Sequence, residues 1–349
     1  EDRLSFLWAL HRYRQGQIGE ARELLLKSSP ERDPKGWHRL RANIADREGD
    51  STTAFAASVE VNRLTDGMDA WRERAREFRR GLRDLAERVA YDKSLNDIAA
   101  PSPPGPAFIV GFPRSGTTLL DTFLMGHSSI VVLEEKEIFR QATKRLGIDL
   151  PSTHRLPALE SARSEYLRLL AQQTDQNAGT LVIDKDPLNM LAPHLIRALF
   201  PHSPIIFVQR HPCDVVLSCF MQSFTPNLGM ANFLDLSDAV DFYDSAMAVW
   251  TAATANLPLN VRTVVYEDLV QDPEGQLRPV VEFLGLDWED GLLDHRSTAA
   301  ARGAIMNTSY NQVTERLTGA AVGRWRRYEK QLEDVLPKLL PWAERLGYR

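Results

Sequence analysis

The chain has 349 residues, and 42 basic against 47 acidic side chains leave a formal net charge of −5. Its hydrophobic share of 43% is ordinary for a folded protein, so a disordered or fibrous chain is excluded. The negative balance argues against a general nucleic-acid binder, because binding to a phosphate backbone needs a dominant basic face. At roughly 100–200 residues per domain, the length predicts two domains.

No segment predicts a membrane span or a secretory signal. The apolar runs fall short of the ~18 residues that a span requires, and Glu1-Asp2-Arg3 do not begin a signal peptide. The two cysteines, Cys213 and Cys219, are too few for a metal cluster or a disulfide framework and fit a reducing compartment. We therefore expect a cytoplasmic protein in which both cysteines are packing residues.

Residues 1–98 are predicted to be helical, because they carry amphipathic stretches and almost no alternating β-branched residues. A weak repeat of 33 or 34 residues pairs Gly16 with Gly49, Ala21 with Ala54 and Trp37 with Trp71. This period is typical of the tetratricopeptide hairpin, in which Gly closes the turn and Ala lets two helices approach. A generic helical bundle is the alternative, because Gly81 comes too early in the third repeat.

The stretch 99–106 has four prolines in its last six residues, which no helix accommodates, so it predicts a stiff linker. Short apolar runs then alternate with helical segments, and these runs are 108–110, 181–183, 205–208 and 264–265. Runs that are apolar on both faces are typical of a parallel sheet covered by helices. The predicted layout is therefore an all-α helical-repeat domain at 1–98, the linker at 99–106, and an α/β domain with a P-loop-like parallel sheet at 107–349.

The strongest motif joins the first apolar run to a helix start, and it is Val110-Gly111-Phe112-Pro113-Arg114-Ser115-Gly116-Thr117-Thr118. Gly111 and Gly116 have the G-x4-G spacing of a P-loop, whose backbone N–H groups and helix N-terminus bind phosphate. A P-loop triphosphatase has Lys after the second Gly, whereas this chain has Thr117 there and its cation inside the loop at Arg114. The motif predicts an anion site without the lysine used in Mg²⁺-dependent γ-phosphoryl transfer. A Gly/Pro turn without a ligand is the alternative.

This loop resembles the 5′-phosphosulfate loop of sulfotransferases, which use 3′-phosphoadenosine 5′-phosphosulfate (PAPS) as sulfuryl donor. The resemblance implies that Arg114, Ser115, Gly116, Thr117 and Thr118 bind the donor. The segment 205–212 resembles the strand and helix start of the family's 3′-phosphate site and implies that Arg210 and Ser218 bind that phosphate. A planar guanidinium and a hydroxyl suit a phosphate monoester. A surface ion pair is the alternative role for Arg210.

Further segments resemble tyrosylprotein sulfotransferases in the same chain order. They are Glu134-Glu135, Val182-Ile183-Asp184-Lys185-Asp186-Pro187, Tyr266-Glu267-Asp268-Leu269, Ser309-Tyr310-Asn311-Gln312-Val313 and Gly323-Arg324-Trp325. Tyr266 and Arg324 are thereby implied to contact the nucleotide. The resemblance covers about residues 106–349, and with the helical repeats before it the layout resembles bacterial tetratricopeptide-containing sulfotransferases.

Sulfuryl transfer to a hydroxyl is an in-line displacement with three requirements. It needs a base, donors around the sulfuryl oxygens, and charge at the oxygen that leaves with 3′-phosphoadenosine 5′-phosphate (PAP). No metal is required. The resemblance implies Glu135 as the base, Lys185 at the bridging oxygen, and Arg114 with Ser309 at the transferred group.

Two other residues compete for the role of base. Glu134 is adjacent to Glu135, and a carboxylate at a helix N-terminus is the structural alternative for both. His127 is the second rival because cytosolic sulfotransferases use a histidine, but it matches a histidine of the tyrosylprotein relatives that is not their base. We therefore expect Glu135 to be the base and His127 to be a buried, hydrogen-bonded residue.

Two departures from the tyrosylprotein pattern bear on the ligands. Gln222 stands where those relatives have a cofactor-binding arginine. Glu137 and Gln141 stand where they have arginines that attract acidic peptides, so an acidic acceptor is disfavoured. The stretch 220–243 is rich in Phe, Met and Leu and predicts an apolar acceptor pocket, with helix core as the equal alternative.

The sequence therefore predicts a PAPS-dependent sulfotransferase whose acceptor, a small molecule, a glycan or a protein with a hydroxyl or amine, stays open. The helical repeats are expected to bind the acceptor or a partner protein and not PAPS, because no phosphate motif precedes Pro101. A P-loop kinase is the alternative enzyme, and Thr117 argues against it. A non-catalytic nucleotide-binding scaffold is a further alternative. The presence of Glu135, Lys185 and Ser309 together argues against it.

Overall fold

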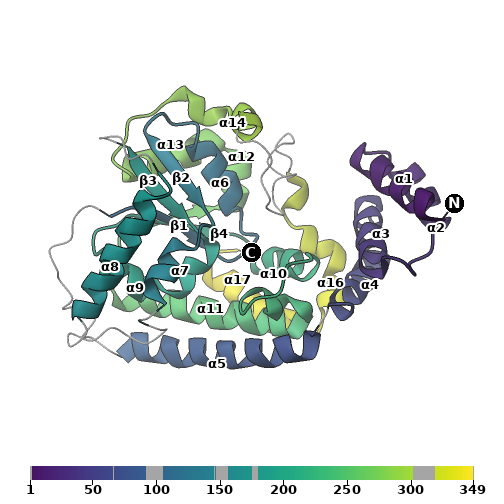
Figure 1. The fold of residues 1–349 in the computed structure, drawn as a ribbon, viewed down its shortest axis with the longest axis horizontal. Coiled ribbons are helices and arrows are strands. Elements are labelled where there is room, and N and C mark those ends of the chain that lie inside the picture. The colour runs from purple at the N-terminus through teal and green to yellow at the C-terminus, as the bar shows by residue number, and fades with distance from the viewer. Residues whose placement is uncertain are drawn as a thin grey trace. The chain divides into compact units, whose positions relative to one another are not determined.

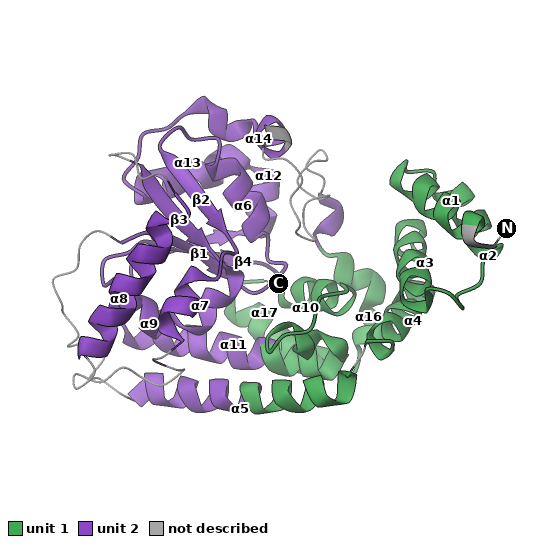
Figure 2. Ribbon diagram, viewed as in Figure 1, with its two compact units in different colours: residues 1–78, 211–242, 323–349 green, residues 79–210, 243–322 purple. Residues whose placement is uncertain are grey.

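The computed structural model describes residues 2–65, 67–91, 105–144, 146, 156–174, 180–301 and 319–348. These residues form two compact units, each assembled from segments that are far apart in the sequence (Figure 2). Unit 1 comprises residues 1–78, 211–242 and 323–349, and unit 2 comprises residues 79–210 and 243–322. Most of the expected linker lies outside the described residues, so the boundaries at 98 and 107 stay a prediction.

Unit 2 is built, over its described residues, around a parallel sheet of five strands in the order β2-β3-β1-β4-β5. Figure 1 labels β1, β2, β3 and β4. The strands are β1 (Ala107–Gly111), β2 (Ile130–Glu134), β3 (Leu181–Lys185), β4 (Ile205–Gln209) and β5 (Val261–Val265). Four of them contain the apolar runs that predicted them, and the parallel arrangement is confirmed. β2 is not among the predicted runs.

The strand order creates a switch point beside β1. From β1 the chain passes to β2 on one side of the sheet, and from β4 it passes to β5 on the other. The carboxyl ends of the neighbours β1 and β4 thus border the place where open parallel sheets bind ligands. The phosphate loop follows β1 and Arg210 follows β4, so both phosphate motifs emerge at this point.

Helices cover both faces of the sheet (Figure 1). Successive side chains of a strand point to opposite faces, so neighbouring residues of one strand pack against different helices. Ile109 of β1 packs into a core with α6 (Thr117–Leu124) and α13 (Pro273–Phe283). Its neighbour Phe108 contacts an aromatic cluster from α7 (Ile138–Thr143), α8 (Leu156–Ala171) and the end of α9 (Pro193–Leu199), formed by Phe139, Tyr166 and Phe200. The described part of unit 2 also contains the end of α5 (Met68–Tyr91), most of α11 (Leu236–Asn256), α12 (Tyr266–Gln271), α14 (His295–Ala301), η3 (Pro187–Leu191), η5 (Asp290–Leu293) and η6 (Gly319–Ala321).

Unit 1 begins with two helical hairpins, as the helical prediction requires. The first pairs α1 (Asp2–Arg14) with α2 (Ile18–Leu26), and the second pairs α3 (Pro34–Glu48) with α4 (Ser51–Arg63). Gly16 and Gly49 occupy the turns in the left-handed region, with φ of 75° and 83°. Ala21 and Ala54 are fully buried where the paired helices meet. The hairpins agree with the repeat, and the assignment to tetratricopeptides stays a prediction.

The third predicted repeat contains no hairpin turn at its glycine. Gly81 lies inside α5 (Met68–Tyr91), a continuous helix of 24 residues. The rest of unit 1 contains α10 (Pro212–Phe220), η4 (Met230–Leu234), the start of α11 (Leu236–Asn256), η7 (Arg324–Tyr328), α16 (Glu329–Leu332) and α17 (Leu336–Arg345). Cys213 and Cys219 are both buried in α10, and neither belongs to a disulfide. No helix in the described part of the chain has the length and hydropathy to span a membrane.

Candidate active site

The phosphate loop runs from Gly111, at the end of β1, to Gly116, where α6 begins. A Cβ at Gly111 would lie 2.6 Å from the carbonyl oxygen of Val208. A Cβ at Gly116, which has a φ of 105°, would lie 2.4 Å from the ring of Tyr266. Both glycines are therefore required by the close packing of the loop against its neighbours.

Two side chains of this loop have unusual surroundings. Arg114 adopts a left-handed φ of 70°, which costs a non-glycine residue on the order of 1 kcal/mol. Ser115 is buried, and its Oγ has no hydrogen-bond partner among the described residues. Thr117 and Thr118 follow in the buried first turn of α6, whose first N–H groups have no partner within the helix. The arrangement fits an anionic ligand.

Arg210 is buried at the end of β4, beside the phosphate loop. Its Nη1 donates to the carbonyl of Arg114 at 3.0 Å, and its Nη2 donates to the carbonyl of Ala321 at 2.6 Å. The guanidinium carbon lies 4.4 Å from the ring centre of Tyr266. Nε is buried with no hydrogen-bond partner in the described structure. The fold thus holds a cation with an unused donor at the switch point.

An ion cluster joins the ends of β2 and β3 to α6. The Nζ atom of Lys185 lies 3.0 Å from a carboxylate oxygen of Glu134, 3.0 Å from one of Glu135 and 3.2 Å from one of Asp121. The side chains of Lys185 and Asp121 are fully buried, whereas that of Glu134 is 17% exposed and that of Glu135 is 46% exposed. One ammonium therefore contacts three carboxylates of increasing exposure.

The cluster keeps Lys185 charged. Burial acts to lower the pKa of Lys185, but the charges of Asp121, Glu135 and Glu134 outweigh it and raise that pKa above its ordinary value. A compact ammonium that stays protonated suits the stabilisation of negative charge on a single oxygen.

Sequence reasoning missed Asp121. It is the charged residue of α6, whose other positions hold Thr, Leu and Phe. A carboxylate in so apolar and buried a helix requires a cationic partner, because an unpaired buried charge is strongly unfavourable. That pattern could have identified Asp121 as a member of a buried ion pair, although not Lys185 as its partner.

The backbone beyond β2 is strained beside this cluster. The N–H of Glu135 donates to the carbonyl of Lys185 at 2.8 Å, and Glu135 and Glu137 have left-handed φ of 49° and 54°. With Arg114, they are the non-glycine residues of the described chain that have positive φ. Such conformations persist where the surrounding structure enforces them, typically at functional sites. Glu134 and Glu135 lie at a strand end, ahead of the helix α7.

His127 does not join the cluster's contacts. It is buried, its Nδ1 accepts from the N–H of Ser129 at 3.0 Å, and its Nε2 lies 2.9 Å from the carbonyl of Asp287, to which it donates. Both ring nitrogens are therefore engaged in holding loops together. The expectation of a buried, hydrogen-bonded histidine is confirmed.

Three predicted site residues lie elsewhere. Ser309 is outside the described residues. Ser218, on α10, and Arg324, on η7, belong to unit 1. Arg324 pairs with Asp46 of α3, with Nη2 3.1 Å and Nε 3.2 Å from its carboxylate oxygens. The nucleotide contacts of these residues stay predictions.

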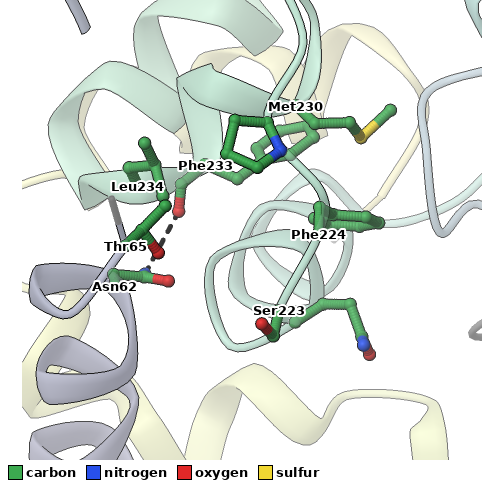
Figure 3. Close-up of a pocket in the computed structure, with 9 residues that line it drawn as sticks. Asn62, Thr65, Ser223, Phe224, Met230, Phe233 and Leu234 are labelled. Atoms are coloured by element: carbon green, nitrogen blue, oxygen red, sulfur yellow. Dashed lines mark hydrogen bonds between the residues drawn. The ribbon is translucent and has the colours of Figure 1, made fainter. Parts of the chain in front are cut away.

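The predicted acceptor stretch, 220–243, contains much helix core, because Phe220, Phe233 and Phe242 are at most 3% exposed. Beside it, unit 1 has a small hollow between α4 and the segment 222–234 (Figure 3). The amide of Asn62 donates to the carbonyls of Phe220 at 3.1 Å and Phe233 at 3.2 Å, so α4 is tied to the chain just before that segment and to the segment's end. The lining includes Thr65, Gln222 and Ser223 as well as Phe224 and Met230. This mixture does not identify a ligand.

A comparison with known protein families identifies the class of protein to which the chain belongs. The family model described as "Sulfotransferase family" matches residues 106–290, which is more than half of the chain. The chain therefore belongs to the sulfotransferase family and falls among the sulfotransferase enzymes.

Individual relatives are more distant. An uncharacterized protein of Aquifex aeolicus (strain VF5) is 26% identical over 310 residues, which are 84% of this chain and 40% of that protein. Protein-tyrosine sulfotransferase 1 of Danio rerio is 25% identical over 260 residues, 69% of this chain and 71% of the relative. The chain thus spans less than half the length of the first relative and about two thirds or more of the second.

Solved structures support the fold. The "Sulfotransferase Domain from the Curacin Biosynthetic Pathway" superposes with a TM-score of 0.50 and 21% identity, and covers 71% of this chain and 99% of its own. At that identity the likeness concerns the fold alone.

Proposed function

We propose that the chain transfers a sulfuryl group from PAPS to a hydroxyl or amine at the carboxyl edge of the unit 2 sheet. The observation that carries the proposal is the ion cluster, in which the helix that begins in the phosphate loop supplies one of three carboxylates around a buried lysine. The cluster offers a cation for a leaving oxygen and a carboxylate for a proton. Membership of the sulfotransferase family supports the same chemistry.

The donor would be held by both phosphate motifs. The loop N–H groups, the start of α6 and Arg114 would bind the 5′-phosphosulfate, and the unpartnered Oγ of Ser115 offers a further hydrogen bond. Arg210, with its unused Nε, would bind the 3′-phosphate beside Tyr266. Ser218, Arg324 and Ser309 are proposed as further contacts on the resemblance alone.

The transfer step is a displacement at sulfur that needs no metal. The acceptor oxygen or nitrogen attacks the sulfur while its proton passes to Glu135, and the bond from sulfur to the bridging oxygen breaks on the opposite side. The electron pair of that bond stays on the 5′-phosphate oxygen of PAP, next to the charge of Lys185. Glu135 suits the role of base because it is the most exposed carboxylate of the cluster, so an acceptor can reach it.

The surroundings of the base disfavour an acidic acceptor. Glu137 follows Glu135 closely and pairs with Arg140. Asp186 lies nearby, and burial together with the repulsion of Glu135 and Glu137 raises its pKa to about 6. We propose a neutral or cationic acceptor, and not a tyrosine within an acidic peptide.

The helical hairpins of unit 1 are proposed to bind the acceptor or a partner protein, because helical repeats present binding surfaces.

Ligand-dependent melting tests the proposal without an acceptor. PAP at about 100 times its Kd, in EDTA, should stabilise the protein by roughly 2.7 kcal/mol. That corresponds to a rise in Tm on the order of 5–10 °C. A shift with ATP and Mg²⁺ but none with PAP would replace the proposal with a P-loop kinase.

A further inference from the structure

The three carboxylates around Lys185 differ in what they would lose if the lysine moved. An ammonium has three N–H bonds, and each of them has a carboxylate neighbour here. A ligand oxygen that approaches Lys185 must therefore replace one of the three. Water can solvate Glu135, which is 46% exposed, but cannot reach Asp121, which is fully buried. Glu135 is the exchangeable partner and Asp121 the permanent one.

The carboxylates also hold Lys185 from different directions. Glu134 and Glu135 lie at the end of β2, which is separated from β1 by β3. Asp121 lies on α6, whose first turn follows directly from the phosphate loop. Among the described residues, Asp121 is thus the carboxylate that ties Lys185 to the helix of the phosphate loop.

We infer that Asp121 is a positioning residue for sulfuryl transfer, which holds the ammonium of Lys185 toward the phosphate loop. When the donor binds, Lys185 keeps its contact with Asp121 and exchanges Glu135 for the oxygen that leaves with PAP. The exchange frees Glu135 to accept the proton of the acceptor. The inference rests on the proposed function and deepens it, because it explains how one lysine serves the leaving group without holding the base.

Binding of PAP tests this without knowledge of the acceptor, since PAP carries the leaving oxygen. Isothermal titration would give the Kd of PAP for the full chain, Asp121→Asn, Lys185→Met and the double variant. Lys185→Met should weaken binding about ten-fold or more, because a charged hydrogen bond is lost. Asp121→Asn should weaken it about five-fold, although removal of a negative charge would by itself tighten the binding of an anion. In the Lys185→Met background, Asp121→Asn should cause no further loss.

Asp184→Asn is the matched control. Asp184 precedes Lys185 in β3 and is also buried, but its carboxylate accepts from the hydroxyl of Tyr166 at 2.9 Å on the opposite face of the sheet. Its replacement should leave the Kd of PAP within about two-fold. A crystal structure of the unsubstituted chain with PAP keeps the test independent of how the variants fold. It should show Nζ of Lys185 still in contact with Asp121 and no longer in contact with Glu135.

Several results would overturn the inference. One is that Asp121→Asn binds PAP as tightly as the unsubstituted chain does. Another is that it shows the same loss with and without Lys185, which would mean that Asp121 acts through the fold. In the crystal structure, a Lys185 that left Asp121 and kept Glu135 would also contradict it. If the unsubstituted chain does not bind PAP, the proposed function fails and the inference fails with it. If that chain binds and only the Asp121 effects are missing, the inference alone fails.

Discussion

The carboxyl edge of the unit 2 sheet and the helical hairpins of unit 1 solve the same local problem, a tight turn, in different ways. In the hairpins, glycine occupies the left-handed positions, at Gly16 and Gly49. At the sheet edge, Arg114, Glu135 and Glu137 occupy such positions although each carries a side chain. The backbone of the hairpin turns is unstrained, whereas the backbone at the sheet edge is strained where it positions charged side chains.

The two regions also bury different groups. The first hairpins share a core of Ala9, Ala21, Leu25, Leu40 and Ile44. The sheet edge buries Lys185 with Asp121 and leaves Ser115 Oγ without a partner in the described structure. Substitutions at the edge should therefore change chemistry and ligand binding, and those in the hairpins should change stability.

The largest effect should come from the base. Glu135→Gln keeps the size and polarity of the side chain but cannot take a proton, so kcat should fall by about 10²–10⁴. The affinity for PAP should not fall, because Glu135 gives up its contact with Lys185 when PAP binds. Transfer of labelled sulfate from PAPS to an acceptor fraction measures the change in kcat. A titration with PAP measures the affinity.

Glu134→Gln is the control for this substitution, since Glu134 contacts the same ammonium at the same distance. It should reduce turnover much less. Equal losses in the two variants would mean that the base is not Glu135 alone. Near-normal turnover in Glu135→Gln with a large loss in His127→Ala would assign the base to the histidine.

The next largest effect concerns the stability of the protein and the buried residue Asp184, which lies in the core beneath the reactive edge of the sheet. Burial raises the pKa of Asp184 to about 7, despite its hydrogen bond from Tyr166. The neutral acid is thus favoured in the folded state, and its contribution to stability is present at pH 4 and lost as the pH rises through 7. Asp184→Asn should escape this loss and gain about 4 kcal/mol relative to the parent between pH 4 and pH 8. Melting curves of the parent and the variant at both pH values check this. A stability difference between them that is the same at pH 4 and pH 8 would contradict it.

A smaller effect concerns the 3′-phosphate. Arg210→Ala should remove most of the roughly 2.7 kcal/mol by which PAP stabilises the protein at about 100 times its Kd. AMP, which lacks the 3′-phosphate, should stabilise parent and variant alike. If Arg210→Ala lowered the effect of AMP as much as that of PAP, Arg210 would act by supporting the phosphate loop, whose Arg114 carbonyl it contacts.

The smallest effect belongs to the hairpins. Gly49 has a φ of 83°, so Gly49→Ala should destabilise the protein by about 1 kcal/mol. Gly19 lies inside α2 with open space around it, and Gly19→Ala should instead stabilise by about 0.5–1 kcal/mol. Calorimetry measures both. Neither variant should change the affinity for PAP, and a large change would show that the hairpins complete the cofactor site.

The parts of the fold that were predictable are those in which neighbouring residues decide the structure. Continuous apolar runs predict β1, β3, β4 and β5 because a parallel strand is buried on both faces. β2 escapes this test, since three of its five residues are only partly buried. Glycine and alanine at the right spacing likewise predict the hairpins, whereas the continuous helix through Gly81 depends on packing along its length.

The candidate site, like the fold, was predictable only where residues close in the sequence decide the structure. The spacing of Gly111 and Gly116 predicts the phosphate loop, and the resemblance implies the roles of Glu135, Lys185 and Arg210. The contact between Asp121 and Lys185 joins a helix face to a strand end. It depends on how α6 lies on the sheet, and no local pattern encodes that orientation.

The most direct measurement is sulfuryl transfer itself. The chain would be incubated in EDTA with PAPS carrying labelled sulfate and with a fractionated extract of its host, and the labelled product would be identified by mass spectrometry. We predict that label passes to a neutral or cationic compound, and that Glu135→Gln abolishes nearly all of this transfer. Transfer of labelled phosphate from ATP with Mg²⁺, and none of sulfate from PAPS, would contradict the account.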